Sequence, residues 1–176
     1  AEASFVARTV DSDRKHLTEV LRQAAAHPGT ALVEIYQNCN IFNDGAFEVL
    51  KDKQQAEEAV IRLEHGRPIR FGAEGAKGVV RDHRTGDLEV VTVTEENEAD
   101  LMVHDAHATS PTTAFALSRL ADPDTLHHTP IGVFRDVERP VYDTLMADQL
   151  DTAIEQNGKG DLATLLAGGD TWTVVG

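Results

Sequence analysis

The fold is decided near the start of the chain, by Ser4-Phe5-Val6-Ala7-Arg8-Thr9-Val10 and Ala31-Leu32-Val33-Glu34-Ile35-Tyr36. Both stretches have the apolar character of short strands, and we expect the second to be buried. Between them, Asp11-Ser12-Asp13 offers N-cap side chains for a helix. Its apolar residues fall at helical spacing, and His27-Pro28-Gly29 ends it. Strand, helix and strand in about 35 residues predict a βαβ unit with parallel strands.

A parallel strand is normally buried on both faces, which requires further strands and helices. The chain begins with only Ala1-Glu2-Ala3 before its first strand. We therefore expect residues 1–45 to be the last βαβ unit of a larger doubly wound domain whose front part is absent. The predicted domains are residues 1–50, the end of an α/β domain, and residues 51–176, a smaller α+β region.

The second region mixes helix and strand signals. A helix is predicted over residues 56–65. A β-hairpin is predicted from residues 77–81 and 88–93, and a further strand from residues 100–105. Further helices are predicted beginning at Pro111, over residues 142–156 and near residues 161–167, before an apolar tail at residues 171–175.

Composition places the chain among globular proteins, with 41% hydrophobic residues and 26% charged residues. The formal net charge is −14, and there is no basic cluster to bind a phosphate backbone, so nucleic-acid binding is not expected. No apolar run approaches the roughly 20 residues that span a bilayer. A single cysteine and no basic-then-apolar signal segment predict a cytoplasmic setting.

Common catalytic and binding motifs are absent. The glycines at Gly72, Gly75, Gly86 and Gly168-Gly169 are predicted to form turns, because none sits between a strand and a helix as a phosphate loop requires. His104, His107 and the pair His127-His128 are predicted to be solvated loop residues, because a closed zinc site needs four convergent ligands.

Cys39 is the only cysteine, and it follows the second strand within Tyr36-Gln37-Asn38-Cys39-Asn40-Ile41-Phe42-Asn43-Asp44-Gly45. The carboxyl ends of parallel strands are where open α/β sheets hold ligands. A lone cysteine is most often a small packing residue, and a catalytic thiol would need an activating base or helix N-terminus. The polar neighbours Asn38, Asn40, Asn43 and Asp44 argue against pure packing, because amides and backbone N–H groups can donate hydrogen bonds to cluster sulfurs.

The Cys39 segment, extended through Ala46-Phe47, resembles the segment after the last strand of the thiamine-diphosphate domain in β subunits of 2-oxoacid:ferredoxin oxidoreductases. Further stretches along nearly the whole chain share the resemblance, namely residues 3–8, 13–17, 67–72, 129–135 and 139–142. Of these, residues 129–135 and 139–142 are similar to the two-subunit bacterial members of the family, the 2-oxoglutarate enzymes.

The resemblance implies a reaction in which a 2-oxoacid is decarboxylated on thiamine diphosphate, coenzyme A accepts the acyl group, and a [4Fe–4S] cluster passes electrons to ferredoxin. It implies an α subunit as partner and Mg²⁺ beside the diphosphate. Cys39 maps onto the fourth cluster ligand, and Asn43 and Asp44 are expected near the cofactor.

The chain lacks the family's C-x-x-C pair, its third cysteine and its Gly-Asp-Gly motif. We therefore expect it to correspond to the C-terminal half of the subunit, to bind no cofactor by itself and to be catalytically silent in isolation. Three alternatives remain open: a non-catalytic module for subunit interaction, a pyruvate-type member of the family, and a thiol enzyme acting alone.

Overall fold

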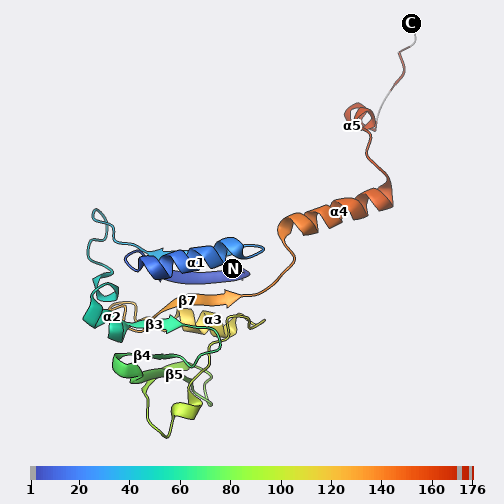
Figure 1. Ribbon diagram of the computed structural model, residues 1–176. Coiled ribbons are helices and arrows are strands. Elements are labelled where there is room, and N and C mark those ends of the chain that lie inside the picture. Colours follow the sequence, from blue (N-terminus) through green and yellow to red (C-terminus); the bar gives the residue numbers. More distant parts are fainter. Residues whose placement is uncertain (1–2, 170–171, 175) are drawn as a thin grey trace. The chain divides into compact units, whose positions relative to one another are not determined.

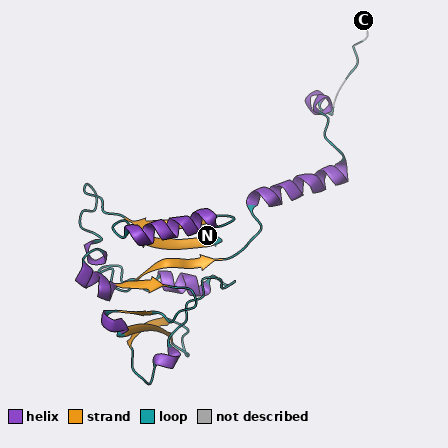
Figure 2. Cartoon of the chain, viewed as in Figure 1, coloured by secondary structure: helices purple, strands orange, loops and turns teal. Residues whose placement is uncertain are grey.

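The computed structural model describes residues 3–169, 172–174 and 176 (Figure 1). The chain divides into two compact units, Ala1–Arg139 and Pro140–Gly176. The first unit contains both sheets, and the elements among the described residues of the second are two helices (Figure 2).

The larger sheet has four strands in the order β2-β1-β7-β3. Strands β1 (Phe5–Val10) and β2 (Ala31–Tyr36) pair in parallel, so the predicted βαβ unit is confirmed. Strand β7 (Thr129–Asp136) runs antiparallel to β1 and parallel to β3 (Val60–Leu63). The sheet is therefore mixed, and it joins strands from both sides of residue 50. The domain boundary predicted at residue 50 stays a prediction.

Helix α1 (Arg14–Ala26) connects the two parallel strands, as predicted. The Asp13 side chain caps it by accepting a hydrogen bond from the His16 N–H. Val20 is its buried residue and packs with Phe5 and Ala7 of β1. This contact holds the helix on one face of the sheet (Figure 1).

The prediction that β2 is buried was wrong. Leu32 is 56% exposed and Ile35 is 41% exposed. The reason is position, because β2 is an edge strand whose described neighbour in the sheet is β1. An apolar sequence indicates that a strand can be buried, but its actual burial depends on which strands and helices pack against it.

The predicted helix over residues 56–65 was also wrong in part. Helix α2 (Lys53–Ala59) begins earlier, because the Asp52 carboxylate accepts hydrogen bonds from the N–H groups of Gln54 and Gln55. It gives way to β3 at Val60. Val60 and Ile61 are β-branched, and Ile61 gains complete burial by pairing beside β7.

The smaller sheet is antiparallel and consists of β4 (Arg70–Phe71), β5 (Lys77–Arg81) and β6 (Leu88–Thr92). Its β5–β6 hairpin confirms the prediction, and Asp82 organises the turn by accepting from the Arg84 and Thr85 N–H groups. The predicted strand over residues 100–105 is instead two isolated bridges, Val80–Leu101 and Pro68–Val103. This segment pairs at one residue with β5, through Val80, and at one residue with the segment before β4, through Pro68.

The main core joins the two sheets. It contains residues from β3, β4, β5 and β7, together with Leu117 of α3 (Thr112–Ser118), which begins just after Pro111. Its buried members are Ile61, Leu63, Ile69, Phe71, Val79, Leu117 and Phe134. Short 3₁₀ turns complete the first unit at Glu48–Leu50, Ala73–Gly75 and Glu98–Asp100.

The second unit contains α4 (Tyr142–Asn157) and α5 (Leu162–Ala167), close to the predicted bounds. Neither helix has a buried residue, and Leu145 and Leu150 of α4 are 53% and 56% exposed. In the predicted tail, residues 172–174 form no strand, and residues 171 and 175 lie outside the described residues. Among the described helices, none has the length and apolar character needed to cross a membrane.

Candidate functional site

Cys39 lies in a turn that begins three residues after β2, and its side chain is half-exposed. The Asn43 N–H donates to the Cys39 carbonyl oxygen at 2.9 Å, and the two residues form an isolated antiparallel bridge. The turn therefore closes on the cysteine. The thiol lies at the carboxyl end of a parallel strand, as the sequence predicts.

Asn38 holds this turn together. Its side-chain Nδ2 donates to the Asn40 and Asp44 side-chain oxygens at 2.7 and 2.8 Å. Its side-chain Oδ1 accepts from the Gly45 N–H at 2.9 Å. Gly45 has a φ of +77°, which suits glycine. Asn43 and Asp44, the two predicted neighbours of the cofactor, are thus parts of the Cys39 turn itself.

Aromatic stacking closes the base of the turn. The rings of Tyr36, the last residue of β2, and Phe47 stack with their centroids 4.7 Å apart. At the other end, Ile41 and Phe42 are 84% and 89% exposed. The turn presents two apolar side chains to its surroundings while its base is packed.

Backbone N–H groups point toward the sulfur. Those of Phe42 and Ile41 contribute most, with Asn43 adding to them, and together they lower the pKa of the Cys39 thiol from its ordinary value. N–H groups that stabilise a thiolate in this way also stabilise the negative charge on a cluster sulfur. The Cys39 turn therefore fits one thiolate ligand of an iron–sulfur cluster.

The described residues include no group of three or more His, Cys, Asp or Glu side chains that could hold a metal ion. Cys39 could therefore offer at most one cysteine ligand to a cluster. A [4Fe–4S] cluster is held by four cysteine thiolates, so a cluster that included Cys39 would need three ligands from outside these 176 residues.

Replacing Asn38 tests whether the turn tunes the thiol. In Asn38→Ala, we expect the pKa of Cys39 to rise toward its ordinary value, because the N–H groups lose their fixed direction. The measurement is the rate of iodoacetamide alkylation between pH 6 and pH 10. Asn157→Ala, in α4, is the control and should leave the profile unchanged. We call the hydrogen bonds of the Asn38 side chain to Asn40, Asp44 and Gly45 the Asn38 clamp. An Asn38→Ala profile that coincides with that of the wild type would contradict the role of this clamp in lowering the pKa of Cys39.

His104 corrects one sequence prediction. It is 1% exposed rather than solvated, and its Nε2 lies 2.7 Å from the Val133 carbonyl oxygen. Burial lowers the pKa of its imidazole. His104 is a core residue that joins the segment after residue 100 to β7. His107 and His127 are exposed, as predicted, and His128 is partly buried.

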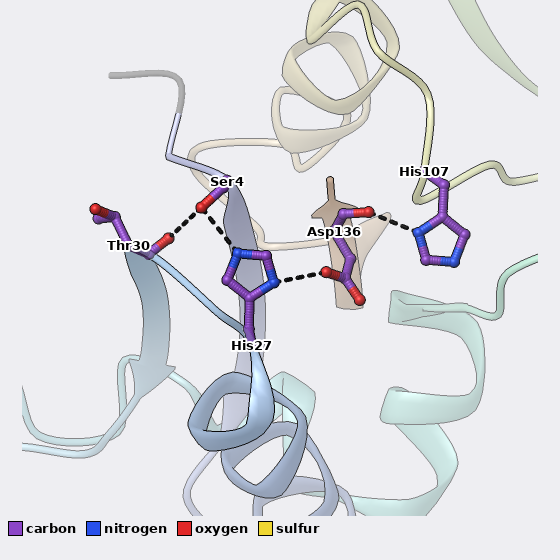
Figure 3. Close-up of polar contacts among 5 residues, drawn as sticks. All are labelled: Ser4, His27, Thr30, His107 and Asp136. Atoms are coloured by element: carbon purple, nitrogen blue, oxygen red, sulfur yellow. Dashed lines mark hydrogen bonds and ion pairs between the residues drawn. The ribbon is translucent and has the colours of Figure 1, made fainter. Parts of the chain in front are cut away.

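A polar network that the sequence did not reveal joins three distant segments (Figure 3). His27, at the end of α1, contacts the Asp136 carboxylate through Nδ1 and the Ser4 hydroxyl through Nε2, both at 2.8 Å. Ser4 Oγ also donates to the Thr30 carbonyl oxygen at 3.1 Å. The order Ser–His–Asp is that of a hydrolase triad, but Ser4 is only 6% exposed and its hydroxyl is committed to Thr30. The network instead ties the start of β1 to the end of β7.

Removing the central imidazole should cost stability. In His27→Ala, we expect the free energy of unfolding to fall by about 2–3 kcal/mol, because the buried Ser4 hydroxyl and the partly buried Asp136 carboxylate lose their partner and the buried imidazole leaves a cavity. Urea denaturation measures the loss. His83→Ala, in the hairpin turn, is the matched control and should change stability by less than about 0.5 kcal/mol. Equal effects of the two substitutions would show that the network contributes nothing.

No protein-family model matches the chain. Over 99% of its length, however, it is 50% identical to 2-oxoglutarate oxidoreductase subunit KorB of Mycobacterium tuberculosis. It is 25% identical, over 54% of its length, to the 2-oxoacid:ferredoxin oxidoreductase subunit beta of Saccharolobus solfataricus. The chain spans 46% of the first of these proteins, and its match covers 32% of the second. The chain is therefore similar, over nearly its whole length, to a part of one 2-oxoglutarate oxidoreductase subunit and, over about half its length, to a part of a 2-oxoacid:ferredoxin oxidoreductase subunit.

Proposed function

We propose that the chain is part of the β subunit of a 2-oxoacid:ferredoxin oxidoreductase. The intact enzyme would convert 2-oxoglutarate, coenzyme A and two oxidised ferredoxins to succinyl-CoA, CO₂ and two reduced ferredoxins, in the cytoplasm. The observation that carries this proposal is the identity of 50% to KorB along 99% of the chain. The geometry of the Cys39 turn supports it independently of the identity.

The proposed role of Cys39 is to supply one thiolate to a [4Fe–4S] cluster. When bound, such a cluster passes electrons singly. The chain contributes a sulfur at the end of β2, N–H groups of Phe42 and Ile41 directed at it, and an Asn38 clamp that fixes their direction. Hydrogen bonds to cluster sulfurs raise the reduction potential, because they stabilise the more negative reduced state.

Thiamine diphosphate and Mg²⁺ belong to the proposed enzyme, and the described residues include no group of three or more His, Cys, Asp or Glu side chains that could hold the Mg²⁺. We propose that Asn43 and Asp44 lie close to these cofactors in the intact subunit. In this structure both help to close the Cys39 turn, through the Asn43 N–H and the Asp44 carboxylate.

A second role, contact with an α subunit, is favoured by the exposure of the second unit. The helices α4 and α5 have no buried residue, and their large apolar side chains are exposed. Single exposed apolar residues are ordinary, but a row of them along one helix is typical of an interaction surface. The exposed members are Leu145, Met146, Leu150, Ile154, Leu162, Leu165 and Leu166.

The assay that tests the proposed function uses the complete β subunit, purified together with its α subunit. We expect reduction of ferredoxin that requires both 2-oxoglutarate and coenzyme A. Faster reduction with pyruvate would indicate a pyruvate-type member of the family. Failure to reduce ferredoxin with any 2-oxoacid, in a complex that holds its cofactors, would contradict the proposal. If a β subunit lacking residues 140–176 keeps its cluster but loses the α subunit, the second role is supported.

A further inference from the structure

Arg135 of β7 is a buried cation with unused hydrogen-bond donors. The residue is 2% exposed, and its Nη2 donates to the Thr109 carbonyl oxygen at 3.2 Å. Its Nε and Nη1 are buried and have no partner among the described residues. Three of the five N–H groups of the guanidinium lie on these two nitrogens. No ion pair between described residues includes Arg135. Arg8, by contrast, pairs with the Glu34 carboxylate at 2.6 Å.

An arrangement of this kind is costly. Burying a charge requires a counter-charge or a full set of hydrogen bonds, and arginine cannot escape the cost by losing its proton. The single bond to Thr109 meets only a small part of the requirement. The structure thus holds a positive charge for which the described residues provide no anion.

Arg135 also lines a cavity of about 750 Å³ within the first unit. This volume is in the range of small-molecule sites in proteins. Two imidazole groups around it are engaged with Asp136: His27 Nδ1 lies 2.8 Å from its carboxylate, and His107 Nδ1 lies 2.6 Å from its carbonyl oxygen (Figure 3). Glu138 and Arg139 also line the cavity, and both are exposed. Arg135 is accordingly the lining residue that offers buried, unused donors.

We propose that this cavity, the Arg135 cavity, binds a small oxyanion. A carboxylate or phosphate group is the chemistry that a guanidinium recognises best, through short, charge-assisted hydrogen bonds. Because Nε and Nη1 are buried, the proposal requires the Arg135 side chain to rotate toward the cavity when the anion binds. Ala26, Pro28 and Val137 give the walls an apolar portion that accommodates a carbon skeleton attached to the anionic group. This site is separate from the Cys39 turn, and its existence does not depend on the proposed redox function.

The test measures anion binding to the purified protein at constant ionic strength. Inorganic phosphate and succinate are titrated separately by calorimetry, with chloride as the background anion. We expect at least one of them to bind the wild type with a dissociation constant below 1 mM, on the order of affinity expected for a small charged ligand. The anion that binds more tightly identifies whether the site takes phosphate or carboxylate.

The decisive variant is Arg135→Met, which keeps the length of the side chain and removes its charge. We expect its dissociation constant to be at least about tenfold higher, as the loss of a charge-assisted hydrogen bond predicts. The control, Arg84→Gln, removes one positive charge from the exposed hairpin turn and should bind like the wild type. Equal binding by wild type and Arg135→Met overturns the proposal, as does the failure of both anions to bind the wild type.

A second measurement needs no variant. The ¹H–¹⁵N resonance of the Arg135 Nε–H is expected to move on addition of the binding anion, because this N–H gains an acceptor. A resonance that stays in place at saturating anion overturns the proposal. It would also be overturned by a carboxylate side chain of a partner subunit already paired with Arg135 in the assembled enzyme, which would abolish anion binding there.

Discussion

Gly132→Ala is expected to destabilise the first unit by about 3 kcal/mol or more. Gly132 lies in β7 with a φ of +118°, where residues with a side chain are strained. A Cβ at this position would also lie 2.7 Å from the Leu63 carbonyl oxygen and 3.2 Å from the Leu63 Cβ. Gly132 and Leu63 are partners in the β3–β7 ladder, so neither backbone can move without breaking the pairing. The midpoint of urea denaturation measures the loss.

Gly66→Ala separates the steric contribution from the conformational one. Gly66 has a φ of +74°, but a Cβ there would meet no atom within 4 Å. We expect this variant to lose only about 1 kcal/mol, the cost of placing alanine in a conformation that favours glycine. Similar losses in the two variants would mean that the close approach of β3 and β7 at Gly132 is not as the structure describes.

Cys39→Ala is expected to have the largest effect on activity. In the complete enzyme, reduction of ferredoxin should fall by at least about 100-fold, because a cluster with three protein thiolates is unstable or shifted in potential. Steady-state ferredoxin reduction with 2-oxoglutarate and coenzyme A measures the loss.

Ile41→Ala is the matched control for Cys39→Ala. Ile41 lies in the same turn and is 84% exposed, and the substitution keeps the backbone N–H that points toward the sulfur. Its activity should remain close to that of the wild type. If Cys39→Ala retains full ferredoxin reduction while the control behaves as expected, Cys39 takes no part in electron transfer.

The elements that could be predicted from sequence are those with local signals. The β1–α1–β2 unit follows from two apolar runs, an Asp13 cap and the His27-Pro28-Gly29 stop. The β5–β6 hairpin follows from two β-rich runs around a turn organised by Asp82. In each case the residues that determine the structure are neighbours in the chain.

The elements that could not be predicted depend on partners distant in sequence. Val60 and Ile61 continue an apolar helical pattern, and they become a strand because β7, about 70 residues later, lies beside them. The insertion of β7 next to β1 has no local signal at all. The exposure of β2 likewise follows from its place at the edge of the sheet.

The same distinction holds for the sites. The polar residues around Cys39 are visible in the sequence, but the direction of the Phe42 and Ile41 N–H groups requires the folded turn. Nothing in the sequence brings Ser4 to His27, because the contact depends on how the ends of β1 and α1 meet. Arg135 reads as an ordinary charged residue until the fold shows that it is buried without an anion.

The central claim is that Cys39 ligates the cluster. Its most direct test is the EPR spectrum of the dithionite-reduced complete enzyme, recorded together with its iron content, for wild type and Cys39→Ala. We predict the signal of a reduced [4Fe–4S] cluster in the wild type, and its loss or conversion to another cluster type, with less iron, in the variant. An unchanged spectrum at unchanged iron content in Cys39→Ala would contradict the claim.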